Sequence, residues 1–437
     1  MSWLTRHRIR LYVRNSIWLL PAASIVAGLA SVALLTRVDR AFGWEMRVGL
    51  DTARAIVGTV AGSMFSLLVL VCSAVLVAVQ LASAQLTPRI ITLVYRNPFR
   101  KFALALFAFT FTFAVGLLVR LEESVPLVTG YLAAYGFLLN LALFLLFVDG
   151  VGKTLRPSTA LRTVALLGRE VVASVYPRRL DERRPAPPAP FKPLEGGPRR
   201  VVLSEEDGAV LAFDLKGLVS LAGRADCLVE LVPEVGDYVA AGDPLFHVYE
   251  GGGRLSEDDL RGSVALGPER TLEQDPLFAF RIIVDIAARA LSPAVNDPTT
   301  AVTALDHIQH LLRHVGRRDL SEGRAADAAG RVRLVYRTPG WDDFVRIAVT
   351  EIRQYGRDSI QVMRRLRAML ENLIETLPER RGPALRRELE LLEDSAKRTF
   401  PDADDQNLAK TGDLQGLGGS SNGRRAPEVS SVANSAA

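Results

Sequence analysis

The chain has 437 residues, of which 49% are hydrophobic, and their concentration toward the N-terminus excludes an ordinary soluble domain and a disordered chain. Its 53 Lys and Arg residues exceed its 48 Asp and Glu residues by five, which gives no indication of nucleic-acid binding. The two cysteines, Cys72 and Cys227, lie far apart and suggest neither a disulfide nor a thiolate metal site, and no cofactor is predicted.

Four runs without a charged side chain occupy residues 15–36, 55–88, 102–119 and 124–148. Each is long enough to cross about 30 Å of hydrocarbon as a helix. The third run has Phe at every second position between Phe107 and Phe113, which would favour a strand in a soluble protein. In lipid an open strand leaves its backbone groups unpaired, so we expect a helix. The sequence therefore predicts an α-helical membrane protein with four transmembrane helices within residues 15–148.

The charges beside the runs predict the orientation. The basic N-terminus, residues 1–14, precedes a run longer than the apolar core of a signal peptide, and no small-residue cleavage site follows it, so we expect a retained helix. Eleven Lys and Arg residues flank the runs on the side of the N-terminus, against five on the other side. The positive-inside rule then predicts a multi-pass protein with both termini in the cytoplasm.

The second run carries a stripe of small residues. At 34 residues it would be roughly 50 Å long as a helix, so part of it must extend beyond the lipid core. The small residues follow a four-residue spacing broken at one position: Gly58, Gly62, Ser66, Ala74, Ala78 and Ala82. Such a stripe lets another helix backbone approach closely, within the same bundle or between subunits around a pore. We expect the upper part, with Gly62, to contact its own bundle and the lower part, with Ala78 and Ala82, to contact another chain.

The runs contain no Asp, Glu, Lys or Arg, which weighs against a proton-coupled transporter. Asn140 is the strongly polar side chain deep in the fourth run. A hydrogen bond between helices explains it more simply than a role as a transport ligand.

Beyond the runs, the sequence predicts a cytoplasmic α+β region. Its segments are a juxtamembrane helix in residues 149–176, a Pro- and Arg-rich linker in 177–200, a small β-rich module in 201–267, a helical unit in 268–400 and a disordered tail in 401–437. The turn at residues 235–245 is similar to that of biotinyl and lipoyl carrier domains. Lys216 lies 20 residues before Gly236, but Leu215 and Gly217 flank it, which favours a structural copy without a modified lysine.

Two Asp-Pro pairs begin helices of the helical unit, at Asp275 and at Asp297. Beside the second pair lies a candidate ligand corner made of Ser292, Asn296, Asp297, Thr299 and Thr300. The free N–H groups of a helix start and two hydroxyls there could hold an anion. The charge of Asp297 opposes an anion, and helix capping alone explains the same residues.

Three histidines lie on one helix face at i, i+3 and i+7: His307, His310 and His314. They are weak candidates for a metal site, because no known ligand signature accompanies them. The sequence contains no nucleophile elbow, P-loop, dinucleotide fingerprint, HExxH or kinase signature. We therefore predict no catalytic residue and no enzymatic activity.

Three motifs together carry a family resemblance: residues 80–89, 270–276 and 290–301. In these the chain resembles the bacterial predicted-membrane-protein family named domain of unknown function 2254, from the first helix to about residue 395. The resemblance implies a four-helix region in the bacterial inner membrane and a cytoplasmic domain. It brings no function.

Two functions agree with the sequence. The first is a homo-oligomeric channel or pore-like protein with a cytoplasmic regulatory domain, favoured by the long helix with its small residues. The second is a membrane-anchored adaptor or regulator that binds a cytoplasmic partner without transport, favoured by the long soluble part. In both, the lipid bilayer is a partner, nucleic acid is not, and the soluble partner is not identified.

Overall fold

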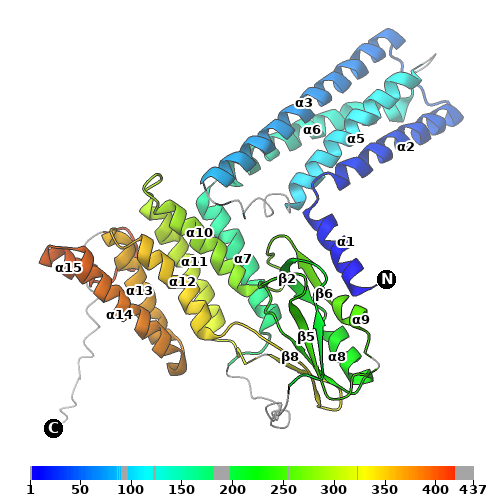
Figure 1. Cartoon of the computed structure of the whole chain (residues 1–437). Coiled ribbons are helices and arrows are strands. Elements are labelled where there is room, and N and C mark those ends of the chain that lie inside the picture. The colour runs from blue at the N-terminus through cyan, green and yellow to red at the C-terminus, as the bar shows by residue number, and fades with distance from the viewer. Residues whose placement is uncertain are drawn as a thin grey trace, which may run out of the picture.

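The computed structural model describes residues 2–85, 87, 89, 97–121, 125–154, 156–180, 197–253, 255–321 and 323–418. Four long apolar helices stand together at one end of the molecule, and a larger part with helices and two small sheets lies at the other end (Figure 1). Most of the sequence-predicted linker, residues 181–196, lies outside the described residues, as do residues 419–437 of the predicted tail.

The four long helices, which we call the apolar bundle, are α2 (Leu19–Phe42), α3 (Leu50–Gln85), α5 (Pro98–Arg120) and α6 (Leu127–Thr154). Each is long and apolar enough to cross a membrane. The central helix is α5, because 56% of its most apolar stretch is buried, against 17–22% in the other three. The run with alternating Phe is helical as predicted: Phe107 packs on Phe147 of α6, and Phe111 packs on Phe65 of α3.

Two glycines bring α2 and α5 into close contact. A Cβ on Gly28 would lie 2.4 Å from Oγ1 of Thr112, and a Cβ on Gly116 would lie 2.6 Å from Cγ1 of Val32. Larger side chains would therefore force the two helices apart. Close backbone approach of this kind is how helices hold together where lipid removes the hydrophobic drive between them.

A buried carboxylate joins the C-terminal end of α2 to the N-terminal end of α6. Asp39, which is 1% exposed, accepts hydrogen bonds from the backbone N–H groups of Val128 and Thr129, at 3.2 and 3.0 Å, and from the Thr129 hydroxyl, at 2.7 Å. The first N–H groups of a helix have no partner within the helix and carry partial positive charge. Asp39 thus caps α6 from a neighbouring helix.

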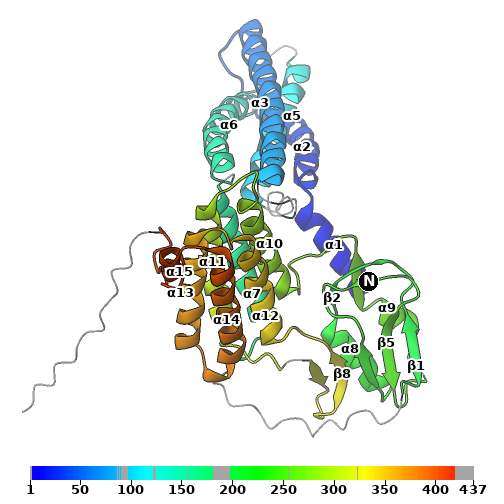
Figure 2. The same ribbon diagram turned by 60° about the vertical axis from the view of Figure 1, so that its left-hand side comes forward.

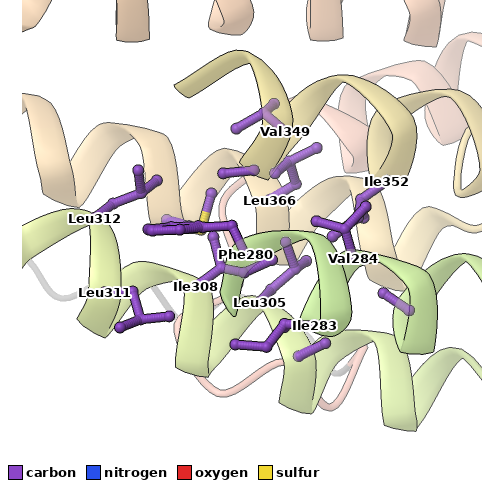
Figure 3. Packing of buried hydrophobic residues seen from close by; sticks show 14 of the residues in the cluster. Phe280, Ile283, Val284, Leu305, Ile308, Leu311, Leu312, Val349, Ile352 and Leu366 are labelled. Atoms are coloured by element: carbon purple, nitrogen blue, oxygen red, sulfur yellow. The ribbon is translucent and has the colours of Figure 1, made fainter. Parts of the chain in front are cut away.

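The helical unit consists of α7 (Pro157–Val175), α10 (Pro276–Ala290), α11 (Pro298–Gly316), α12 (Trp341–Tyr355), α13 (Ile360–Thr376), the 3-10 helix η2 (Glu379–Arg381) and α14 (Gly382–Thr399). Their apolar faces meet in one core, in which Phe280, Leu305 and Leu366 come from α10, α11 and α13 (Figure 3). The predicted juxtamembrane helix forms α7. Its Leu161 and Val164 are fully buried in this core, because a helix with one apolar face needs a packing partner.

The β-rich module has two sheets. The strands are β1 (Arg200–Leu203), β2 (Gly208–Phe213), β3 (Leu228–Leu231), β4 (Tyr238–Val239), β5 (Pro244–Tyr249), β6 (Val264–Gly267), β7 (Arg324–Ala326) and β8 (Val332–Tyr336), with the short helices α8 (Leu215–Arg224) and α9 (Glu257–Arg261). One sheet has the order β1-β5-β3-β8-β7 and the other β4-β2-β6. The module predicted for residues 201–267 is therefore completed by β7 and β8, which come from inside the predicted helical unit. In the parallel pair of β3 and β8, Val229 lies opposite Leu334.

The likeness to carrier domains does not extend to the lysine. Lys216 lies exposed in the first turn of α8, whose N-cap is Asp214, and not in a turn between strands. Leu218 and Ala222 of this capped amphipathic helix are buried.

The basic N-terminus is the helix α1 (Trp3–Asn15), which runs from the apolar bundle to the β-rich module (Figure 2). Its Trp3, Leu4 and Leu11 pack on a small apolar cluster of β2 and β6. Ion pairs from Arg8 to Glu206 and from Arg14 to Glu273, both at 2.9 Å, flank this contact. The N-terminus and the β-rich module therefore lie at the same end of the bundle.

The predicted disordered tail is ordered through residue 418. After α15 (Ala403–Ala409), the chain passes over α13 and covers Arg364, which is 1% exposed. The Arg364 guanidinium donates to the carbonyls of Thr411 and Gly418, at 3.1 and 3.2 Å, and Asp413 accepts from three backbone N–H groups of the same segment. A buried guanidinium needs acceptors, and the segment supplies them despite its polar composition.

Candidate functional site

The small residues of α3 face two different surroundings. Ala78 and Ala82 are 6% and 2% exposed, whereas a Cβ on Gly58 or Gly62 would meet nothing within 4 Å, and Ser66 is exposed. The lower part of the stripe, with half-buried Ala74, thus packs within its own chain, and the upper part faces outward. This is the reverse of the sequence-based assignment.

The reason lies in the length of α3. Its lower end leaves the apolar bundle and joins the core of the helical unit, where Val79 is buried and Val75 packs against the same cluster. The lower small residues Ala78 and Ala82 are therefore covered within the chain. Nothing in the sequence of α3 alone indicates this cover.

The outward face of α3 carries a second pattern, which the four-residue spacing conceals. Polar residues recur at every seventh position, and all are exposed: Thr52, Thr59, Ser66, Ser73 and Gln80. We call them the polar stripe. The spacing is present in the sequence, so a search for a seven-residue period would have found it. The stripe is uncharged, as the part of a helix within a membrane requires.

Inside the apolar bundle, Asn140 makes the contact predicted for it. Its Nδ2 donates to Oγ1 of Thr110 on α5 at 2.6 Å and to the Gly136 carbonyl at 2.8 Å, and the side chain is fully buried. Asn140 thus joins α6 to α5 by a hydrogen bond and lies away from the outward face of α3.

The candidate corner before α11 is built by capping. Oδ1 of Asp297 accepts from the Thr300 N–H at 3.1 Å, and Oδ2 accepts from the Thr300 hydroxyl at 2.5 Å. The Ser292 hydroxyl donates to the Arg289 carbonyl, and Asn296 adopts a φ of 48° between the two helices. Thr299 is exposed. The carboxylate thus occupies the helix start at which an anion would bind.

The three histidines of α11 do not converge. His310 is exposed, and His307 and His314 are half-buried. Burial, followed by nearby Arg318, lowers the pKa of His314 to about 4, and Nε2 of this neutral ring lies 3.4 Å from the Arg318 guanidinium. Within the described ranges, no group of three or more His, Cys, Asp or Glu side chains could hold a metal ion.

A charge network joins the lower end of the bundle to the helical unit. Arg89, after α3, pairs with Asp285 of α10. Arg281, one turn earlier, donates to Asp285 at 2.6 Å and makes two bonds to Glu351 of α12, at 2.5 and 2.6 Å. Hydrogen bonds from Arg281 lower the pKa of Glu351, so this carboxylate stays charged. A two-bond arginine pair of this kind fixes the orientation of both helices.

These features define a mostly helical protein with four potential membrane spans, the longest of which is joined to the helical unit by packing and charge. The family described as "Predicted membrane protein (DUF2254)" matches residues 14–372. The chain belongs to this family, as its three motifs indicate. Two relatives are uncharacterized proteins of Mycobacterium bovis and Mycobacterium tuberculosis, each 29% identical over 436 residues that cover 93% of this chain and 81% of the relative. No solved structure matches.

The corner makes a prediction about capping. Asp297→Asn and Asp297→Ser keep an acceptor for the Thr300 N–H and should be nearly neutral, whereas Asp297→Ala should lower the free energy of unfolding by about 0.5–2 kcal/mol. Thermal unfolding of the purified protein in detergent measures this. Loss of cellular function in Asp297→Asn with unchanged stability would show that the corner binds a ligand.

Proposed function

We propose that the protein is a homo-oligomeric, pore-like protein of the bacterial inner membrane, in which α2, α3, α5 and α6 cross the bilayer and the soluble part is a non-catalytic regulatory domain in the cytoplasm. The observation that carries the proposal is the outward-facing polar stripe of α3.

The spacing of the polar stripe favours contact with a second copy of α3. Seven residues fall about 20° short of two full turns of an α-helix, so a straight neighbour would lose the stripe over its length. Two helices that cross in a left-handed sense keep it between them. The empty space above Gly58 and Gly62 gives a neighbouring backbone room to approach this face.

The chemistry of the polar stripe favours water on its open side. The hydroxyls of Thr59 and Ser66 donate to carbonyls of their own helix, at 2.8 and 3.1 Å. The hydroxyl protons are thus used within the helix. The hydroxyl oxygens can still accept a hydrogen bond, and lipid tails have no donor for them. Around a water-filled axis these oxygens accept hydrogen bonds from water. The polar stripe carries no charged side chain that would repel ions of one sign.

The soluble part is connected to α3 in a way that suits regulation. The packing of Val79 in the core of the helical unit and the pair between Arg89 and Asp285 tie the lower end of α3 to α10. A rotation of α10 therefore moves the same helix that carries the polar stripe.

Disulfide trapping tests the subunit contact. In a chain with Cys72→Ser and Cys227→Ser, the substitution Ser73→Cys should give crosslinked dimers in membranes. The matched control keeps native Cys72 with Cys227→Ser: Cys72 is also exposed, one residue away and turned by about 100° around the helix. Equal crosslinking in both chains, or none at Ser73→Cys, contradicts an interface at the polar stripe.

Planar-bilayer recordings test conduction. The reconstituted protein should give single-channel steps, and Ser66→Phe should reduce their amplitude severalfold, because a ring at the axis narrows the path. Cys72→Phe, on the same helix but off the polar stripe, should leave the amplitude unchanged. Silent bilayers from well-folded protein overturn the pore.

Silence together with a co-purifying soluble protein supports the second candidate, a membrane-anchored adaptor. One observation favours it. Val201 and Leu203, on the edge strand β1 of the larger sheet, are 41% and 43% exposed. An apolar sheet edge can accept an added strand from a partner.

The proposed orientation rests on the basic residues beside the spans and on the position of α1 next to the soluble part. A reporter that works only in the cytoplasm should be active when fused after Leu93 or Thr163 and inactive after Gly49. Activity after Gly49 overturns the four-span arrangement with both ends in the cytoplasm.

A further inference from the structure

A cavity of about 200 Å³ lies between the β-rich module and the helical unit. Phe213 and Tyr336 form its aromatic wall, with ring centroids 5.1 Å apart, and Leu215 and Pro276 add apolar surface. Glu234, in the turn before β4, and Arg337, after β8, supply the charged groups. The volume corresponds to about seven water molecules, or to one small organic ligand.

The walls of the cavity are fixed by buried hydrogen bonds. The hydroxyl of Tyr176, which is fully buried, donates to the Pro339 carbonyl at 2.9 Å. The Gln274 side chain accepts from the Phe213 N–H at 3.1 Å and donates to the Phe213 carbonyl at 3.2 Å. A ligand therefore meets a preformed site and loses little binding energy to ordering the protein.

The charges around the cavity favour a cation. Three carboxylates act on Glu234 from neighbouring elements: Asp237 in its own turn, Asp343 in α12 and Asp275 at the start of α10. Arg337 opposes them. Two of the three are themselves paired: Asp275 with Arg270 and Asp343 with Arg346, both at 2.6 Å. Among the described residues, no cationic group forms an ion pair with Glu234 within 4.0 Å. With these two ion pairs set aside, the carboxylates of Glu234 and Asp237 outnumber the one opposing charge, that of Arg337.

We propose that this cavity binds a small organic ammonium ion, with the ammonium group on the Glu234 carboxylate and its apolar body against Phe213 and Tyr336. Aromatic rings attract cations through their electron-rich faces, and a nearby carboxylate completes the charge balance. The site does not depend on whether the protein forms a pore.

The site should depend on pH through Glu234. Burial, followed by the charge of Asp237, raises the pKa of this carboxyl to about 6, while Arg337 works against the shift. An ammonium ion binds the ionised form, so protons compete with it below the pKa. From pH 7.5 to pH 5.0 the affinity should fall about tenfold, and an alkylammonium group stays charged throughout this range.

Three probes with the same phenyl body separate the charges: 2-phenylethylamine, L-phenylalanine and 3-phenylpropionate. Isothermal titration of the full-length protein in detergent should detect 2-phenylethylamine, with weaker binding at pH 5.0 than at pH 7.5, and should detect no 3-phenylpropionate. Phenylalanine should bind less tightly than the amine, because its carboxylate meets the surrounding acids. Absence of binding by the amine, or binding of the propionate at equal affinity, overturns the proposal.

Variants locate the binding. Glu234→Gln should lower the affinity for the amine at least about tenfold and remove its pH dependence, whereas Arg337→Gln should raise the affinity severalfold. Glu205→Gln is the matched control: this carboxylate belongs to the same module but pairs with Arg261 on the surface, and its loss should change nothing. Ser174→Trp should fill the cavity and block binding with Glu234 intact. Normal, pH-dependent binding in a well-folded Glu234→Gln protein shows that the amine binds elsewhere.

Discussion

Helix α3 passes unbroken from the apolar bundle into the core of the helical unit, and the rest of the structure depends on this. With 36 residues, α3 is about 54 Å long, more than the ~30 Å that a membrane span needs, and its lower end has partners outside the apolar bundle. It finds them in the helical unit, where Val79 is buried. The upper end contacts α5 and α6 on one side and leaves its polar side open. The same helix thus contributes to the core of the helical unit and to the outward surface of the apolar bundle.

Much of this fold could be predicted from local patterns. The four apolar runs, the two Asp-Pro helix starts and the role of Asn140 follow from composition and spacing, because the bilayer and the helix ends impose simple rules. The same rules fail where distant segments meet. Strands β7 and β8 are short and lie among helical sequence, and their pairing with β3 becomes visible in the folded chain alone. The burial of Val79 of α3 in the core of the helical unit likewise depends on residues distant in sequence.

Buried charges show the same limit. Asp39 borders an apolar run, and its sequence context does not distinguish a surface acid from the cap of another helix. Arg364 lies on a helix rich in Arg, and carbonyls of the segment up to residue 418 accept from its buried guanidinium. In both cases the cost of burying a charge is offset by backbone groups distant in sequence. A sequence pattern records the charge but not the distant backbone that receives it.

The path from the cavity to α3 runs through one helix. Pro276 at the start of α10 borders the cavity, and Asp285, nine residues later in the same helix, pairs with Arg89 after α3. Helix α10 is held rigidly, since Arg281 binds Asp285 and the carboxylate of Glu351 on α12. A rigid element in contact with two sites transmits a displacement from one to the other if it has two stable positions. If the proposed pore and ligand site are both present, their coupling requires that α10 can rotate while Arg89 remains paired with Asp285, because this ion pair joins α10 to the segment after α3.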